Sequence, residues 1–113
     1  MDELTQRLSD GDQPVAVGGP KPTLDELRHR FEETGYVFVK FTGTRGGTDL
    51  GIRLDRARSD ASAADFDQGA GTLHVEGTLI LNDDPVRCVA DFDLATLVGT
   101  GHLVLIEASE VAV

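Results

Sequence analysis

The stretch Leu73–Leu94, LHVEGTLILNDDPVRCVADFDL, decides the fold, because apolar and polar residues alternate on both sides of a central turn. Alternation with a period of two places every second side chain on the same face of a β-strand. We expect the turn at Asp83-Asp84, with Pro85 opening the second strand, where its missing N–H is tolerated. In this register Gly77 faces Ala90, which leaves a gap inside the hairpin. The residues expected to face inward are Leu73, Val75, Gly77, Leu79, Leu81, Val86, Cys88, Ala90, Phe92 and Leu94.

Four polar residues of this stretch are expected together on its outward face: His74, Glu76, Asp91 and Asp93. The register places Glu76 opposite Asp91 and His74 opposite Asp93. An imidazole among carboxylates is a ligand set for zinc, manganese or iron, and like charges directly opposed favour a protonated carboxyl, as a general acid requires. The alternative is a surface charge ladder, in which basic side chains of neighbouring strands neutralise the carboxylates. The basic candidates are Lys40, Arg53 and Arg87.

An earlier hairpin is predicted from Tyr36–Thr42 and Leu50–Asp55, which alternate in the same way. The expected inward pairs are Phe41 with Leu50, Val39 with Ile52, and Val37 with Leu54. Its connection contains Thr44, Arg45, Gly46 and Gly47. Backbone N–H groups of consecutive glycines, an arginine and hydroxyls together make an anion site. Because the connection joins two strands and opens no helix, an ordinary glycine-rich hairpin turn is the favoured alternative.

A helix is predicted from Thr23 to Gly35, since Thr23 and Glu26 form a capping box. Its apolar stripe of Leu24, Leu27 and Phe31 has helical spacing and needs a surface to cover. Residues 1–22, which precede it, contain two short breaks rich in Gly, Pro and Asp. We expect residues 1–22 to be a flexible N-terminal arm and residues 23–113 to form the single folded domain.

The last strand is predicted at residues 102–107, where Leu103, Val104, Leu105 and Ile106 are apolar on both faces. Such a strand is central in a sheet or covered by a partner. The resulting fold is α+β, with one amphipathic helix packed on a mostly antiparallel five-stranded sheet made of two hairpins and this last strand. Residues 56–71 are expected to be a long connecting loop.

The chain carries 20 acidic and 10 basic residues, a formal net charge of −10. This excess repels phosphate backbones and anionic membrane surfaces, so we expect neither nucleic acid nor membrane as a partner. The same composition is typical of proteins from GC-rich or salt-adapted genomes. Cys88 is the single cysteine, and no secretory signal or apolar run of about 20 residues is present, which predicts a cytoplasmic protein.

No nucleophile elbow, HExxH, paired-cysteine or dinucleotide-binding motif occurs in the chain. We therefore expect an accessory or protein-interaction domain without catalytic activity, which binds a partner protein or a second copy of itself through Leu103–Ile106. One alternative is a small metal-dependent or small-molecule-processing enzyme that uses the cluster of His74, Glu76, Asp91 and Asp93. Another is a small-molecule-binding domain with a pocket at Gly77, gated by residues 56–71. The sequence identifies no cofactor.

Overall fold

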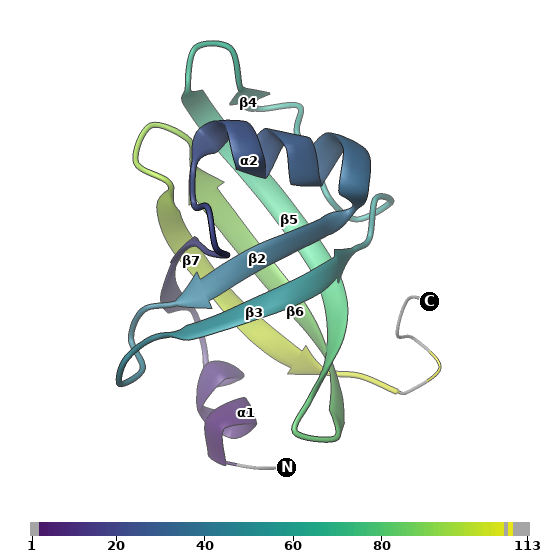
Figure 1. Ribbon diagram of the computed structural model, residues 1–113. Coiled ribbons are helices and arrows are strands. Elements are labelled where there is room, and N and C mark those ends of the chain that lie inside the picture. The colour runs from purple at the N-terminus through teal and green to yellow at the C-terminus, as the bar shows by residue number, and fades with distance from the viewer. Residues whose placement is uncertain (1–2, 108, 110–113) are drawn as a thin grey trace.

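The computed structural model describes residues 3–107 and 109 and shows a mostly β protein, with 48% strand and 17% helix. Six antiparallel strands form a closed barrel, and one short extra strand lies beside it (Figure 1). Residues 1–2 of the predicted arm and residues 108 and 110–113 of the predicted domain lie outside the described residues.

The barrel follows the order β3-β2-β1-β7-β6-β5, and a further pairing of β3 with β5 completes the ring. The strands are β1 (Gln13–Val17), β2 (Tyr36–Phe41), β3 (Thr48–Leu54), β4 (Ala64–Asp65), β5 (Ala70–Leu81), β6 (Asp84–Asp93) and β7 (Val98–Leu105). The helices are α1 (Glu3–Leu8) and α2 (Leu24–His29), and α2 continues directly into the π-helical turn η1 (Arg30–Thr34).

The prediction of one helix on an open five-stranded sheet is wrong, and β1 is the main reason. This strand lies in the stretch expected to be a flexible arm, yet it pairs with β2 on one side and with β7 on the other. Val15, which is 1% exposed, faces Phe41 across one ladder and Gly99 across the other. A strand of five residues containing a proline gives too short an alternation to be recognised in the sequence.

Both predicted hairpins are present, but each register is shifted by two residues from the expected one. Val39 faces Leu50 in the first hairpin, and Leu79 faces Val86 in the second. The second turn is Asn82-Asp83, whose φ angles of 49° and 70° suit a two-residue hairpin turn better than the expected Asp83-Asp84. Because the shift is even, the inward residues stay inward, so the predicted core survives the error.

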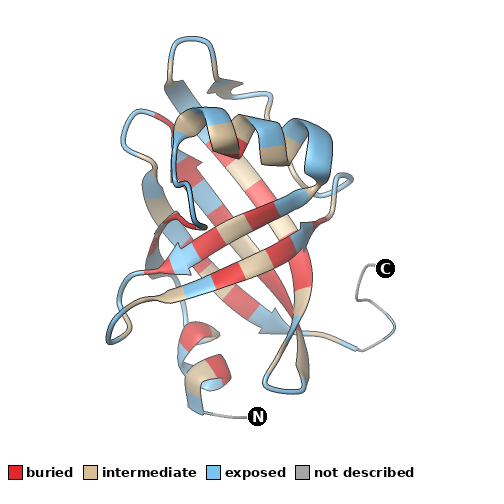
Figure 2. Cartoon of the chain, viewed as in Figure 1, coloured by how far each residue is buried: buried red, intermediate tan, exposed pale blue. Residues whose placement is uncertain are grey.

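The ends of the barrel are covered by helices (Figure 1). The predicted helix begins as expected, with the Thr23 side chain accepting a hydrogen bond of 3.2 Å from the Glu26 N–H. α2 lies across one end and buries Leu27, while α1 lies at the opposite end and buries Leu8; both side chains are 1% exposed. Figure 2 shows buried positions alternating with exposed ones along the strands, as a filled barrel requires.

The predicted gap at Gly77 does not exist. Gly77 faces Cys88, not Ala90, and it pairs with Leu54 of β3 on its other side. A Cβ atom on Gly77 would lie 2.5 Å from the Arg53 carbonyl oxygen and 3.0 Å from Ile52 Cδ1. Glycine therefore lets β3 approach β5 where the barrel closes, and the proposed pocket beside it is filled.

None of the helices in the described part of the chain has the length and apolar composition needed to cross a bilayer.

We expect Gly77→Ala to lower the free energy of unfolding by about 1–3 kcal/mol, because the added methyl group meets backbone that cannot move aside. Urea denaturation measures this. Gly43→Ala is the control, since its Cβ would meet only the Pro14 side chain, at 3.2 Å. Equal effects of the two substitutions would contradict the role of Gly77 in closure.

Candidate functional site

The outward face of the β5–β6 hairpin brings together three of the four predicted polar residues. His74 faces Asp91 across the ladder. Its Nδ1 lies 2.7 Å from Asp91 Oδ1, and its Nε2 lies 2.8 Å from Glu76 Oε2. Asp93 does not join them, because it faces Thr72 and accepts a hydrogen bond of 2.9 Å from the Ala95 N–H. The two-residue register shift accounts for this difference.

The geometry at His74 requires a charged ring, since a neutral imidazole has only one N–H to donate. Burial disfavours the charged form and is the largest single influence, but the hydrogen bonds to Glu76 and Asp91 and the attraction of both carboxylates outweigh it. The pKa of His74 is therefore raised. The cation that neutralises these carboxylates is His74 itself.

Arg87, one of the basic residues expected to neutralise these carboxylates, forms no ion pair with them. Its Nη1 instead lies 3.2 Å from Asp55 Oδ2. The Arg87 side chain is 10% exposed and that of Asp55 28%, so this ion pair is largely shielded from solvent. It fastens the segment after β3 to the outside of β6.

The His74 cluster lies against the segment that follows β3. The backbones of Asp60 and His74 exchange hydrogen bonds of 2.9 and 3.1 Å, and the Ser59 hydroxyl and Glu76 backbone bond to each other in both directions. A hydrogen bond from the Ser62 backbone lowers the pKa of Asp60. The loop predicted at residues 56–71 is thus held along β5, and residues 64–65 form β4 within it.

Metal binding is not supported by this arrangement. Among residues 3–107 and 109, no three His, Cys, Asp or Glu side chains are grouped so that they could hold a metal ion. The lone pairs that the His74 ring would offer to a metal point at carboxylate oxygens instead. The cluster acts as a charged clamp between β5 and β6.

The glycine-rich turn between β2 and β3 lies against α1. Gly46 and Gly47 adopt φ angles of 75° and 78°, and the Gly47 N–H donates to the Thr44 carbonyl at 3.0 Å. Arg7 of α1 reaches the turn and donates from Nη2 to the Gly43 carbonyl at 3.1 Å. An open hollow of about 610 Å³ lies between the two elements. Its lining residues are Glu3, Leu4, Arg7, Thr44, Arg45 and Thr48.

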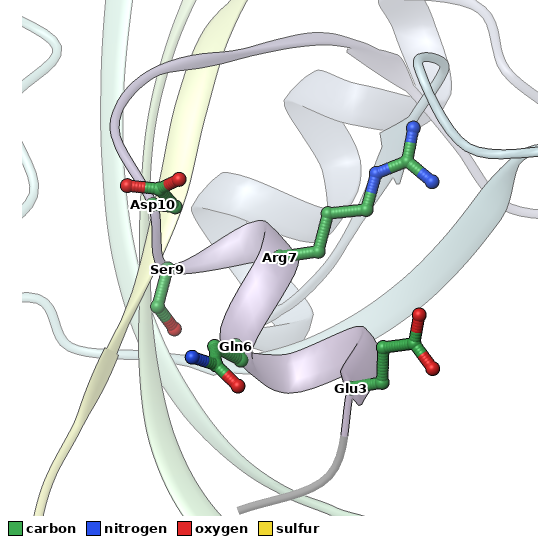
Figure 3. A pocket seen from close by; sticks show the side chains of 5 residues that line it. All are labelled: Glu3, Gln6, Arg7, Ser9 and Asp10. Atoms are coloured by element: carbon green, nitrogen blue, oxygen red, sulfur yellow. The ribbon is translucent and has the colours of Figure 1, made fainter.

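A second hollow, of about 620 Å³, adjoins α1 (Figure 3). Figure 3 shows Glu3 and Arg7 extending to one side of the helix and Gln6, Ser9 and Asp10 to the other. The first two also line the hollow at the turn. Of the predicted anion-site residues, Thr44 and Arg45 line that hollow, while Gly46 and Gly47 shape the turn. Nothing in the sequence around Arg7 predicts that it lines this hollow, because only the fold brings it next to the turn.

The end of β7 is apolar on both faces, as predicted. Leu103 is 1% exposed and belongs to the core, whereas Val104 and Leu105 are 42% and 51% exposed. Ile106 is partly buried and donates its N–H to the Pro85 carbonyl at 3.0 Å. Ile80, which faces Pro85, is 56% exposed. We refer to Ile80, Pro85, Val104, Leu105 and Ile106 as the β7 patch.

Cys88 is fully buried in the barrel, and burial raises the pKa of its thiol to about 12. A thiol in this state does not supply a thiolate at neutral pH.

No protein-family model matches the chain, and no curated protein shows significant similarity to it.

Replacing His74 with Gln removes the cation but keeps a polar side chain. Because the folded-state pKa of His74 lies above the unfolded value of about 6.5, its stabilisation is complete below that pH and is lost as pH rises through the folded-state pKa. We expect H74Q to cost about 1 kcal/mol at about pH 5.5 and clearly less at about pH 9. Urea denaturation at both pH values measures this, and an equal cost at both would contradict the charged clamp.

Ellman's reagent should label Cys88 in the native protein only as fast as the barrel opens, because the thiol is buried and protonated. Labelling should become fast once urea unfolds the chain. Immediate labelling without denaturant would show that Cys88 is accessible.

Proposed function

We propose that this protein is a non-catalytic interaction domain that binds a partner protein through the β7 patch. The observation that carries the proposal is the gathering of exposed apolar side chains at one end of the barrel. Ile80, Val104 and Leu105 are all about half exposed, and together they stand out in a protein whose core is otherwise well filled. Clustered exposed apolar residues of this kind mark interaction sites.

The patch is contiguous because it spans three hydrogen-bonded strands. Ile80 of β5 faces Pro85 of β6, whose carbonyl accepts from Ile106, and Val104 lies opposite Arg87. Val104 and Ile106 share the outer face, since they are two residues apart. Leu105 lies on the other face, at the end of the barrel, where Figure 2 shows β7 becoming exposed. A partner at this end would contact both faces of the strand.

The acidic residues beside the β7 patch favour a different protein as the partner over a second copy of this chain. Asp83 and Asp84 lie at the tip of the β5–β6 hairpin, and Glu107 follows Ile106 directly. Two copies that each carry −10 would bring these acidic residues together, which disfavours self-association. The surface that fits is apolar at its centre and basic at its rim.

Side chains fill the barrel interior, which is consistent with a partner that binds at the surface. Among the described residues, eighteen apolar side chains are buried and include residues from every long strand, and both barrel ends carry a helix. The pocket at Gly77 that favoured a small-molecule-binding domain is occupied by β3.

The test compares Val104→Lys with Val98→Lys, which alters an equally exposed valine (48%) at the opposite end of the same strand. We expect Val104→Lys to weaken partner binding by at least about tenfold, because a charge replaces an apolar contact and repels a basic rim. Val98→Lys should bind like the unaltered protein. Proteins captured by the unaltered chain and by Val98→Lys but lost with Val104→Lys are then produced separately, and their binding is measured by calorimetry.

Light scattering after size exclusion tests self-association in parallel, and we expect a monomer at all concentrations. If the protein is a dimer and Val104→Lys dissociates it, the partner at the β7 patch is a second copy of the chain and not a basic protein. Identical binding by the two lysine variants would overturn the patch as the interaction surface.

A further inference from the structure

We propose that the hollow between α1 and the β2–β3 turn binds a small oxyanion, the phosphate or carboxylate group of a small molecule. The sequence marks only one side of this site, the turn with Arg45. The fold adds Arg7 from a segment far away in the chain and so places two guanidinium groups on one hollow. This site is separate from the β7 patch and does not depend on the interaction function.

The two arginines are held in different ways. Arg7 is anchored to the turn because its Nη2 donates to the Gly43 carbonyl at 3.1 Å, which uses only one of its five N–H groups. Arg45 is exposed on the turn itself. One arginine therefore offers fixed donors, and the other is free to close over a ligand.

Neither arginine forms an ion pair within the part of the chain that the structure describes. Four other arginines, Arg28, Arg30, Arg58 and Arg87, form ion pairs with carboxylates. In that part of the chain Arg7 and Arg45 form none, and neither do Arg53 and Arg56, but only Arg7 and Arg45 line one hollow together. In a chain with twice as many acidic as basic residues, two guanidinium groups that share one hollow and form no ion pair are the feature to explain. A bound oxyanion would supply the missing charge, since arginine forks fit phosphate and carboxylate oxygens.

The threonine hydroxyls of the turn hold its shape. The Thr44 hydroxyl donates to the Phe41 carbonyl at 3.3 Å, and because its one hydrogen is used there it accepts from the Thr48 hydroxyl, 2.7 Å away. The donors that remain for a ligand are the guanidinium groups of Arg7 and Arg45.

Glu3 lines the same hollow and limits its affinity for anions. A carboxylate beside the bound oxyanion opposes it, so a single phosphate should bind weakly. The net charge of −10 does not prevent binding, because salt screens charges farther away than about 8 Å at physiological ionic strength. The site thus distinguishes a small anion from an extended polyanion, which would meet the acidic surface around it.

The experiment is a titration of the ¹⁵N-labelled full chain with inorganic phosphate, and separately with acetate, at constant ionic strength kept with sodium chloride. The signals to follow are the backbone amides of Thr44, Gly46 and Gly47 and the side-chain Nε–H groups of Arg7 and Arg45. We expect saturable shifts at these positions with a dissociation constant on the order of millimolar. Saturation by both anions supports the oxyanion class, and the tighter one identifies the group preferred.

Three variants decide the assignment. Arg45→Ala should weaken binding by about fivefold or more while leaving the Arg7–Gly43 contact intact, and Glu3→Gln should tighten it by about two- to fivefold by removing a like charge. Arg53→Ala is the control, because it removes an exposed arginine near the opposite end of β3 and should change nothing. Shifts that fail to saturate, or that are the same in Arg45→Ala and Arg53→Ala, would overturn the site.

Discussion

Closure of the barrel is the constraint on which the rest of the structure depends, and it is achieved at two narrow contacts. The β3–β5 ladder has two residue pairs, Arg53–Thr78 and Leu54–Gly77, and the Asp55 N–H continues it by donating to the Glu76 carbonyl at 2.8 Å. β1 joins β2 to β7 with a strand of five residues. Without the first contact the six strands would form one open sheet, with unpaired edges at β3 and β5. Without the second, β2 and β7 would each expose an unpaired edge, which invites pairing with other chains.

The candidate sites follow from how the strands pair. The turn between β2 and β3 lies next to α1 because β1 carries α1 to that end of the barrel. The β7 patch forms because β5, β6 and β7 run side by side to the end of the barrel opposite α2. His74 can span Asp91 and Glu76 because the twisted β5–β6 ladder holds them on one face, and that cluster in turn fixes residues 59–60. The hollow beside α1 depends on the pairing of β1, whereas the other two sites lie within the consecutive strands β5, β6 and β7.

Local pattern in the sequence predicted the strands of both hairpins, their inward faces, the capped helix and the apolar end of β7. These predictions rest on periods of two and 3.6 residues, which a sequence displays directly. The registers were harder, since a shift of two residues keeps every apolar residue inside and leaves the alternation unchanged. What decided the second register was the positive φ at Asn82 and Asp83, and this one difference separated Asp93 from His74.

Local pattern in the sequence does not predict the barrel. Val15 and Val17 signal a strand only once β2 and β7 are known to flank them, and Gly77 looked like a gap because its neighbour across β3 was not known. Arg7 illustrates the same limit for the anion hollow, because nothing near residue 7 in the chain indicates the turn. Pairing between strands far apart in the chain, unlike periodicity, produces no pattern in the local sequence.

The pairing of β1 with β7 also has a consequence for how the chain folds. Every other ladder of the barrel joins strands that follow one another in sequence, so those ladders close short or moderate loops. The β1–β7 ladder instead joins the first strand to the last, and its formation requires the largest loss of chain entropy. During synthesis β1 leaves the ribosome first, but one of its two partner strands is made last. Until the β1–β7 ladder forms, the two edges that β1 joins are open to misassembly.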